Sequence, residues 1–377
     1  MKIQKTMHHK SSGWESDLQS NSSENVLVLV FAATTYFEER DVFKELSEKF
    51  PNAILMGCST AGEILGVHVY DDSMVVVVAE FEHTKLVRVN ETIKESDDSE
   101  QAGKKLSEKL VGAGLKSVFV LSDGLAVNGS QLVSGLRCDM PKGVVITGGL
   151  AGDGPNFKRT WILRDGVPVQ GCISAVGFYG ERLKVGYGSK GGWDNFGPIR
   201  TITKSKNNVV FEIDGKPVLD LYKKYLGEKA DGLPSTGLLF PLALTNPDDS
   251  ISVVRTVLAI DEETKSMIFA GDLPEGHKVR LMKANFDSLI DGAEEAASIT
   301  NGLIGEGTQT LTLAISCVGR KLVLGERIED EVEATMDVLP KDTVQAGFYS
   351  YGEISPTGAG SCNLHNQTMT LTAFQEV

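Results

Sequence analysis

Short apolar runs alternate with polar stretches along this chain, and glycine-rich turns follow several of the apolar runs. Residues 26–31 are uniformly apolar, which is typical of a buried strand. A helical stretch with apolar residues on one face follows and ends at Pro51. Strand-like runs at residues 53–56 and 73–81 enclose a turn that begins at Gly57. This part of the chain therefore predicts the order strand, helix, strand, glycine turn, strand.

The same order of elements recurs twice further along the chain. The second copy has strand patterns at residues 117–121, 144–147 and 172–178 and a helical pattern near residues 130–136. The third copy has strand patterns at residues 310–317, 343–348 and 368–374 and a helical pattern at residues 328–337. We therefore predict an α+β fold built from repeated strand-helix-strand-strand units, with mixed β-sheets flanked by helices.

An acidic residue follows a glycine at the turn of each unit. Glu63 and Glu353 each stand six residues after an earlier glycine, and Asp153 stands one residue closer to its own. We predict that these three acids occupy equivalent places in three similar units. Because a glycine adopts a positive φ readily, each carboxylate is expected just after a sharp turn. There the acids either bind one ligand or cap backbone amides, and the sequence leaves both possibilities open.

Hydrogen-bonding side chains are concentrated near the end of the chain, in residues 344–374. Strand patterns at both ends of this stretch predict a hairpin with a long loop. The loop carries Glu353, His365, Asn366 and Gln367, more polar groups than a purely structural connection needs. His365 is therefore a candidate ligand-binding residue, although a buried and hydrogen-bonded structural histidine explains the pattern as well.

The remaining segments predict the domain organisation. Residues 1–24 are polar and show no sustained period, so we expect a mobile arm with His8 and His9 exposed to solvent. The residues GGWDNFGP interrupt regular structure between the second and third units, which predicts a domain boundary there. The expected organisation is a flexible arm at residues 1–24, one domain at 25–200 and a second at 201–377.

Composition places the chain among soluble globular proteins, with 41% hydrophobic and 23% charged residues out of 377. No apolar run approaches the roughly 20 residues that cross a bilayer, and no signal peptide is visible, so we expect a cytoplasmic protein. The net charge of −14 repels nucleic-acid phosphates and anionic membrane surfaces, which argues against both as partners. The five cysteines are scattered, so neither a disulfide framework nor a covalently attached haem is expected.

An enzyme is the main alternative to a binding protein. Cys58 follows a predicted buried strand at a glycine turn, where a nucleophile can be exposed, and His365 is a candidate base for it. The chain lacks GxSxG and Walker A patterns, and the glycines at 186, 188 and 191 spell GxGxxG without the helix that would hold a pyrophosphate. A site based on Cys58 or on the carboxylates stays open as the alternative function.

Several of these segments resemble a known family. MGCSTAGEI at residues 56–64 and GGLAGDG at residues 148–154 resemble the N-terminal half of FIST proteins, and GFYSYGEISP with LHNQTMTLTAF resembles their C-terminal half. The resemblance covers roughly the whole chain after the first ~25 residues. It implies a FIST N and a FIST C domain that sense a small ligand in bacterial signalling. The segments GSKGGWDNFGPIRTIT and LLFPLAL further resemble members that bind haem and sense nitric oxide.

We therefore predict a ligand sensor and not an enzyme. The expected ligand is haem with nitric oxide, or a small metabolite such as an amino acid, whose charges would suit a carboxylate and the backbone amides of the turns. His365 is the candidate haem ligand, with His68 and His83 as alternatives. The output requires a separate partner, a histidine kinase or a cyclic-di-GMP enzyme, and a homo-oligomer is compatible with the sequence. The predicted ligand-binding residues are Gly57, Cys58, Glu63, Gly149, Asp153, Tyr351, Glu353, His365, Asn366 and Gln367.

Overall fold

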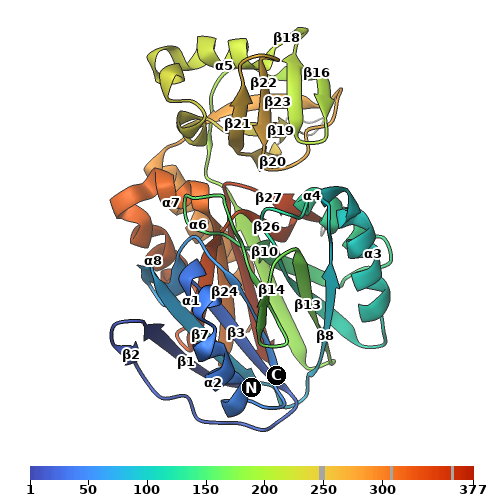
Figure 1. Ribbon diagram of the computed structural model, residues 1–377, viewed down its shortest axis with the longest axis vertical. Coiled ribbons are helices and arrows are strands. Elements are labelled where there is room, and N and C mark those ends of the chain that lie inside the picture. The colour runs from blue at the N-terminus through green and yellow to red at the C-terminus, as the bar shows by residue number, and fades with distance from the viewer. Residues whose placement is uncertain (246–250, 306–308, 358–360) are drawn as a thin grey trace.

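The computed structural model describes residues 1–245, 251–305, 309–357 and 361–377. Figure 1 shows a large body that holds both termini and a small domain above it. The body consists of residues 1–190 and 286–377, and the small domain consists of residues 194–283. The small domain is therefore an insertion into the body.

The body contains three copies of one unit. The first repeat contains β1 (Lys2–His9), β2 (Gly13–Trp14), β3 (Val26–Ala32), α1 (Thr34–Glu39), α2 (Asp41–Lys49), β4 (Ile54–Ser59), β5 (Glu63–Leu65), β6 (His68–Tyr70) and β7 (Ser73–Glu80). The second contains β8 (Lys85–Thr92), a 3₁₀ turn (Ser96–Asp98), α3 (Ser99–Leu110), β9 (Leu115–Ser122), α4 (Gly129–Arg137), β10 (Val145–Leu150), β11 (Ile162–Arg164), β12 (Val167–Val169) and β13 (Cys172–Tyr179). The third contains β14 (Leu183–Lys190), α6 (Phe286–Asn301), β24 (Thr310–Cys317), α7 (Val318–Leu324), a 3₁₀ turn (Gly325–Arg327), α8 (Ile328–Val338), β25 (Thr343–Ser350), β26 (Gly352–Thr357), β27 (Ser361–His365) and β28 (Met369–Glu376).

Each repeat forms the centre of one sheet with the same pairing. The central strand, β3, β9 or β24, pairs in parallel with the strand that follows the helix and antiparallel with the last strand of its repeat. We call the sheets around β3, β9 and β24 the first, second and third sheets. The predicted α+β class, the mixed sheets and the repeated units are confirmed.

A hairpin crosses from each repeat into the sheet of another repeat. The hairpin β5–β6 of the first repeat pairs with β25 in the third sheet. The hairpin β26–β27 of the third repeat pairs with β10 in the second sheet. The hairpin β11–β12 of the second repeat pairs with β4 in the first sheet. Because these exchanges form a closed cycle, no repeat can complete its sheet alone.

Three backbone hydrogen bonds close the same cycle where the hairpins begin. The donors are equivalent N–H groups and the acceptors are equivalent carbonyls of the neighbouring repeat. The bonds run from Ala61 N–H to the Tyr349 carbonyl (2.8 Å), from Tyr351 N–H to the Leu150 carbonyl (3.2 Å) and from Gly152 N–H to the Ser59 carbonyl (2.9 Å).

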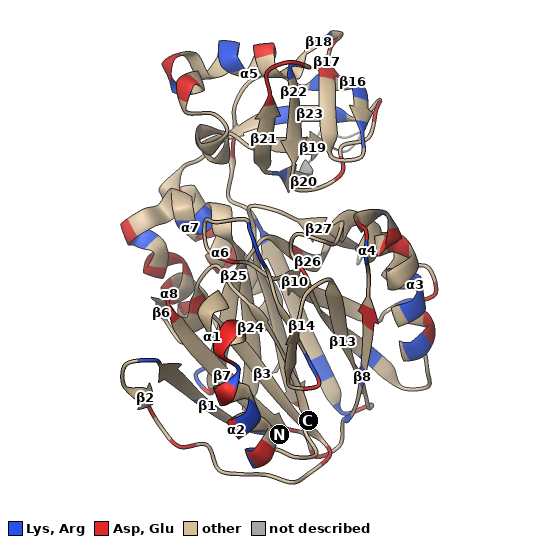
Figure 2. Cartoon of the chain, in the orientation of Figure 1, with Lys and Arg blue, Asp and Glu red and all other residues tan. Residues whose placement is uncertain are grey.

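The apolar core lies between the three sheets. Aromatic pairs connect every sheet to the next: Phe31 stacks on Phe348 at 4.9 Å between ring centres, and Phe374 stacks on Phe178 at 4.6 Å. Phe81, which follows β7, contacts Phe178 edge to face. The outer faces are covered by α1 and α2 on the first sheet, α3 and α4 on the second, and α6 and α8 on the third (Figure 1). Figure 2 shows that charged residues gather on these helices and on loops, while the central strands carry few.

The small domain has its own sheet and its own core. Its elements are β15 (Asp194–Asn195), β16 (Arg200–Lys206), β17 (Val209–Ile213), β18 (Lys216–Pro217), α5 (Val218–Leu226), 3₁₀ turns at Gly227–Gly232 and Ser235–Leu239, β19 (Leu242–Thr245), β20 (Ile251–Arg255), β21 (Val257–Asp261), β22 (Ser266–Phe269) and β23 (Lys278–Lys283). α5 packs against β17 and β22. A smaller apolar cluster that includes Trp193, Val254 and Leu289 joins this domain to the body.

Three expectations from the sequence need correction. Residues 2–9 are not a mobile arm, because β1 pairs with β7 along its whole length. His8 is correspondingly half-buried, and its ring contacts the Tyr36 hydroxyl. The predicted hairpin of residues 344–374 is wrong, because β24 lies between β25 and β28 and a separate hairpin occupies the connection.

Domain organisation is also more interwoven than a cut near residue 200 suggests. The third sheet combines β5 and β6 from the first repeat with strands from the end of the chain. Sheet membership therefore crosses the expected boundary. Among the described residues, no helix combines the length and the apolar character that a bilayer crossing requires.

The strand glycines Gly57, Gly148 and Gly347 yield a prediction for stability. A Cβ added at these positions would lie 2.2, 1.9 and 1.7 Å from a backbone carbonyl oxygen of the central strand, too close for any rearrangement of side chains to relieve. Each Gly→Ala change should therefore destabilise the body by about 1–3 kcal/mol or more, measured by urea unfolding.

Gly302 provides the control for these variants. It has a helical φ of −62° and its added Cβ would meet only ordinary contacts at 3.6 Å, so Gly302→Ala should be neutral or slightly stabilising. If the three strand variants match this control, the close approach of the parallel strands is wrong.

Candidate functional site

Glu63 is a buried carboxyl with local partners. It begins β5 and is 1% exposed. It accepts hydrogen bonds from the Thr60 hydroxyl and from the backbone N–H (3.2 Å) and hydroxyl (2.7 Å) of Ser73. These partners tie the exchanged hairpin to the start of β7 in its own repeat.

Glu353 repeats this arrangement in the third repeat. It is fully buried in β26 and accepts hydrogen bonds from the Ser350 hydroxyl (2.7 Å) and from the backbone N–H (3.3 Å) and hydroxyl (2.9 Å) of Thr368. Each glutamate thus accepts a hydrogen bond from a hydroxyl three residues before it. Each also accepts from a residue at the beginning of the last strand of its repeat, Ser73 for Glu63 and Thr368 for Glu353.

Burial changes the charge state of both glutamates. Desolvation raises the pKa of Glu63 to about 7 and that of Glu353 to about 8, while the hydrogen bonds act in the opposite direction. At neutral pH the Glu353 carboxyl is therefore mostly protonated. A buried neutral carboxyl avoids the cost of burying an unpaired anion.

Asp153 occupies the corresponding place in the second repeat but has different partners. Its carboxylate accepts hydrogen bonds from the backbone N–H groups of residues 157–159, each at 2.8 Å. The Tyr351 hydroxyl also donates to it, and the Tyr351 ring stacks on Phe157 with 4.3 Å between ring centres.

The predicted equivalence of the three acids is confirmed by strand register, because the glycines that precede them pair with equivalent residues of the central strands. The expected positive φ before each acid is found at Gly62 only, and Gly152 and Gly352 lack it. All three acids are occupied by local hydrogen bonds, which favours the capping role. A ligand-binding role for them stays a prediction.

The other residues predicted around the first turn lie inside the body. Cys58 is fully buried. Burial is the main cause that raises the pKa of its thiol well above the ordinary value, and the negative charge of the nearby Glu63 adds to the effect. No hydrogen bond joins Cys58 to His365 in the described part of the chain. Gly57 and Gly149 are strand residues, and the latter leaves room for the Phe348 ring. A thiol that is buried and has a raised pKa is neither exposed to a substrate nor activated as a nucleophile.

His365 ends β27 directly opposite Glu353. Its ring is buried, and Nε2 lies 3.0 Å from the Ser355 carbonyl oxygen, to which it donates. Burial lowers the pKa of His365 to about 4, so the imidazole is neutral at physiological pH.

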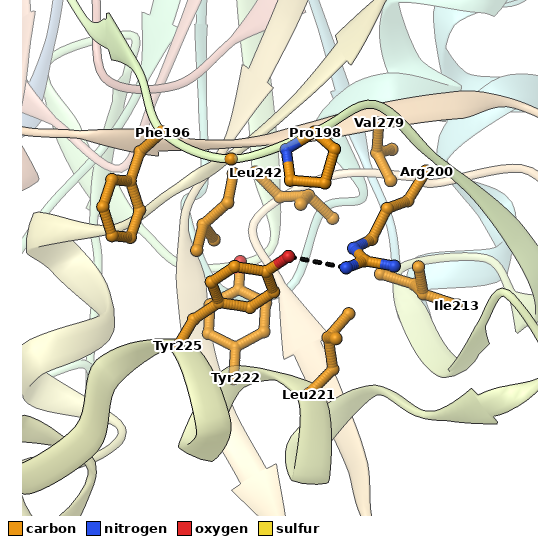
Figure 3. Close-up of a pocket in the computed structure, with 11 residues that line it drawn as sticks. Phe196, Pro198, Arg200, Ile213, Leu221, Tyr222, Tyr225, Leu242 and Val279 are labelled. Atoms are coloured by element: carbon orange, nitrogen blue, oxygen red, sulfur yellow. Dashed lines mark hydrogen bonds between the residues drawn. The ribbon is translucent and has the colours of Figure 1, made fainter.

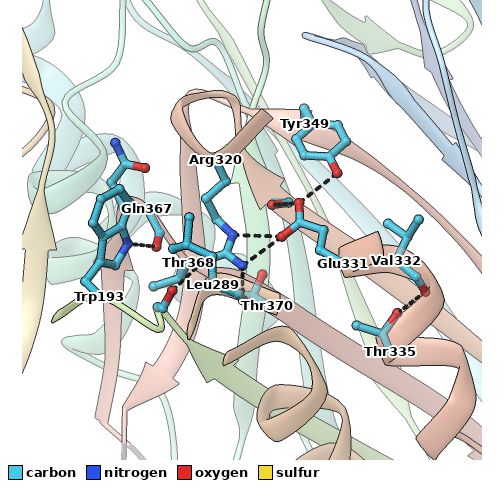
Figure 4. Close-up of polar contacts among 12 residues, drawn as sticks. Trp193, Leu289, Arg320, Glu331, Val332, Thr335, Tyr349, Gln367, Thr368 and Thr370 are labelled. Atoms are coloured by element: carbon cyan, nitrogen blue, oxygen red, sulfur yellow. Dashed lines mark hydrogen bonds and ion pairs between the residues drawn. The ribbon is translucent and has the colours of Figure 1, made fainter. Parts of the chain in front are cut away.

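Asn366 and Gln367 stand out among the buried polar residues because both ends of each side-chain amide are unpaired in the described chain. They are 1% and 0% exposed, yet neither end of either side-chain amide has a hydrogen-bond partner among the described residues. The backbone carbonyl of Gln367 accepts a hydrogen bond from the Trp193 indole at 2.8 Å (Figure 4). Because buried polar groups are nearly always paired, two adjacent unpaired amides require an explanation.

A cavity of about 630 Å³ adjoins this loop between the body and the small domain. His365 and Thr368, on either side of the two amides in the sequence, line it together with Trp193 and Val254. Lys190 and Glu295 form an ion pair on its wall. The cavity size is in the ordinary range for a small-molecule site.

Arg255 reaches the same loop from the small domain, and sequence reasoning missed it. It is 5% exposed and donates hydrogen bonds to the carbonyls of Leu364 (2.9 Å) and Asp272 (3.2 Å). It forms no ion pair with a described residue, and burial lowers its pKa to about 10, so it stays positively charged at pH 7. No motif or spacing in the sequence distinguishes this arginine, so nothing in the sequence pointed to it.

A buried ion pair fixes the chain where it enters the small domain. Arg320 and Glu331 are both fully buried and 2.8 Å apart. Arg320 also donates to the carbonyls of Leu289 and Gly191, and Tyr349 donates to Glu331 at 2.7 Å (Figure 4). The network holds the segment that carries Trp193 against the body.

The predicted site residues thus fall into separate groups. Glu353 pairs with His365, which lines the cavity, while Asn366 and Gln367 follow His365 in the loop without contributing to the cavity lining. Cys58 lies near Glu63 in the body, and Asp153 is joined to Tyr351. No group of three or more His, Cys, Asp or Glu side chains suited to a metal ion occurs among the described residues.

The raised pKa of Glu353 predicts how stability depends on pH. The folded state holds the proton up to about pH 8, whereas the unfolded chain releases it near the ordinary value of 4.5, so this contribution is complete at low pH and is lost as pH rises through 8. Glu353→Gln cannot ionise and keeps the hydrogen bonds. Between pH 6 and 9 the unfolding free energy of this variant should fall by about 3 kcal/mol less than that of the wild type.

Urea unfolding at both pH values measures this difference, with the exposed Glu108→Gln as control. Equal losses in Glu353→Gln and wild type would show that this carboxyl is ionised in the folded protein.

Comparison with known proteins places the chain in a family. The model of the FIST N domain matches residues 26–216, and the model of the FIST C domain matches residues 219–356. An uncharacterized protein of Methanocaldococcus jannaschii is 24% identical over 295 residues, which are 70% of this chain and 56% of that protein. The chain therefore spans little more than half the length of this relative.

A solved structure of cyanuric acid hydrolase from A. caulinodans aligns over 78% of this chain and 99% of its own, at 12% identity and a TM-score of 0.19. A likeness this low carries no argument about fold or activity. The two family matches together cover most of the sequence. The chain belongs to the FIST family, whose domains are associated with sensing small ligands in signalling.

Proposed function

We propose that this protein senses a small polar ligand at the loop formed by residues 365–368, where the small domain meets the body. The observation that carries the proposal is the pair of buried side-chain amides of Asn366 and Gln367, which lack partners among the described residues. Leaving one buried polar group unpaired costs about 1–3 kcal/mol. A ligand that hydrogen-bonds to both amides would recover that cost.

Arg255 supplies the charge for such a ligand. Arg255 is a buried cation that forms no ion pair with a described residue, although the nearby Asp272 partly offsets its charge, and an anionic group on the ligand would neutralise it further. Its guanidinium already contacts the Leu364 carbonyl, two residues before the amides. We therefore assign a carboxylate of the ligand to Arg255, because guanidinium and carboxylate match in geometry.

An amino acid fits this combination of groups best. Its carboxylate would accept from Arg255 and from an amide NH₂, and its ammonium would donate to the amide oxygens of Asn366 and Gln367. Glu353 is mostly neutral at pH 7 and already bonded, so it shapes the site and does not pair with the ammonium. The side chain of the ligand would occupy the cavity of about 630 Å³.

The position of the site supports a signalling role. Arg255 and Trp193 approach the loop from the small domain and its entry segment, whereas the amides belong to the body. A ligand that binds both sides changes how firmly the two parts are held together. We propose that a separate partner, a histidine kinase or a cyclic-di-GMP enzyme, reads this change in the cytoplasm.

Haem with nitric oxide is the second ligand that the sequence suggested. The residues around His365 do not fit an axial haem ligand in this conformation, because Nε2 is already hydrogen-bonded to the Ser355 carbonyl. The alternative histidines His68 and His83 are exposed, with side-chain exposures of 58% and 44%. We therefore favour the amino acid over haem.

Isosteric removal of the amides tests the amino-acid site. Asn366→Leu and Gln367→Met delete unpaired polar atoms, so the ligand-free variants should melt at or above the wild-type temperature. When the common amino acids are added one at a time, at least one of them should raise the wild-type Tm by several degrees. A ligand present at 100 times its Kd stabilises the folded protein by about 2.7 kcal/mol. Both variants should lose this shift.

Gln101→Met on the exposed face of α3 is the matched control and should keep the shift. Two results contradict the proposal: no amino acid changes the Tm of the wild type, or the two variants melt well below it without ligand.

The haem alternative has its own test. Protein purified from haem-supplied cells and then mixed with haemin should remain without a stoichiometric Soret band. A Soret band that shifts with nitric oxide and disappears in His365→Ala would favour the haem sensor over the amino-acid sensor.

A further inference from the structure

A second pocket lies wholly within the small domain, between α5 and the sheet (Figure 3). Its inner part has a volume of about 20 Å³ and is lined mainly by apolar and aromatic groups, among them Phe196, Pro198 and Leu242. It continues into an outer cavity of about 560 Å³, and the two parts share Arg200, Ile213, Leu221 and Tyr225. None of these residues belongs to the loop at residues 365–368.

The inner part contains a hydroxyl that no described residue satisfies. Tyr222 is 1% exposed, and its phenolic oxygen has no hydrogen-bond partner in the described chain. Tyr222 and Tyr225 both line the pocket from α5 (Figure 3). The neighbouring Tyr225 hydroxyl is different, because it accepts a hydrogen bond from Arg200 at 2.6 Å. Among the described residues that line the pocket, the Tyr222 hydroxyl and the Nε of Arg200 are buried polar atoms without a hydrogen-bond partner.

The outer cavity is positively charged, although the whole chain carries a net charge of −14. Lys216 and Lys224 line it and form no ion pair with a described residue. Asp220, the acid on its wall, pairs with Lys265, and Arg200 pairs with Asp214. The two lysines are thus left as cations at the mouth of an aromatic pocket.

We propose that this pocket binds a planar aromatic acid, a single ring that carries a carboxylate at one end and a small polar substituent at the other. The ring would pack among Tyr225, Leu221 and Pro217, which line the outer cavity. The carboxylate would face Lys216 and Lys224. The substituent would reach the Tyr222 hydroxyl, whose buried position excludes competing water.

The chemistry of the lining residues explains the choice of this class of ligand. An aliphatic acid would satisfy the lysines but leave the aromatic walls unused, and a neutral aromatic compound would leave both lysines unpaired. Only a molecule that is apolar in its middle and polar at both ends uses every feature of the pocket. This site is independent of the amino-acid site proposed above.

Titration calorimetry of the full chain with 4-hydroxybenzoate tests the proposal. We expect saturable binding with one site, and at least about fivefold weaker binding of 4-hydroxybenzyl alcohol, which lacks the carboxylate, and of benzoate, which lacks the hydroxyl. The variant Tyr222→Phe should weaken 4-hydroxybenzoate about fivefold and leave benzoate unchanged. The double variant Lys216→Gln/Lys224→Gln should weaken both acids about tenfold.

Lys206→Gln, at the end of β16 and away from the pocket lining, is the matched control and should bind like the wild type. Melting of the ligand-free protein separates a binding role of Tyr222 from a structural one, because removal of an unpaired hydroxyl should leave the Tm of Tyr222→Phe equal to or above that of the wild type. The proposal is overturned if 4-hydroxybenzoate does not saturate the wild type, if the variants bind it equally well, or if Tyr222→Phe lowers the Tm.

Discussion

The cyclic exchange of hairpins is the constraint on which the body depends. Each sheet receives two strands from another repeat, and the backbone bonds from Ala61, Gly152 and Tyr351 close the cycle at the point of exchange. Within each repeat the strand that leads into the exchanged hairpin also approaches the central strand closely, which explains a glycine at the equivalent strand position of every repeat. The buried glutamates then tie each crossing hairpin of the first and third repeats to its own last strand. Stability of one repeat is therefore inseparable from that of the others.

The third repeat differs from the other two because the small domain is inserted into it. By strand register, Asn366 and Gln367 correspond to Asp71 and Asp72 in the first repeat, which are exposed. The same backbone shape recurs, with φ of 62° at Gln367 and 55° at Asp72, so the left-handed residue belongs to the fold and not to a special function. What is particular to the third repeat is the burial of two polar side chains under Trp193 and Arg255. A position that is solvated elsewhere has become a covered polar site here.

The sequence predicted the repeats because local periodicity and glycine spacing report on single elements, and the bounds of strands such as β24 (Thr310–Cys317) and β7 (Ser73–Glu80) follow the expected runs closely. It could not predict the partner sheet of each hairpin, because strand pairing over long distances leaves no local pattern. The N-terminal strand was missed because β1, which lies next to the short edge strand β2, carries polar residues and lacks the apolar run of a buried strand. Arg255 was missed for a similar reason: its burial depends on contact between the small domain and the body, which no stretch of sequence encodes by itself.

A crystal structure of the full chain grown with the amino acid that stabilises it most would test the central claim directly. The account predicts density for one ligand molecule whose carboxylate contacts Arg255 and whose polar atoms lie within hydrogen-bond distance of the side-chain amides of Asn366 and Gln367. Density that shows both amides paired with protein atoms or ordered water, and a ligand bound elsewhere or not at all, would contradict it.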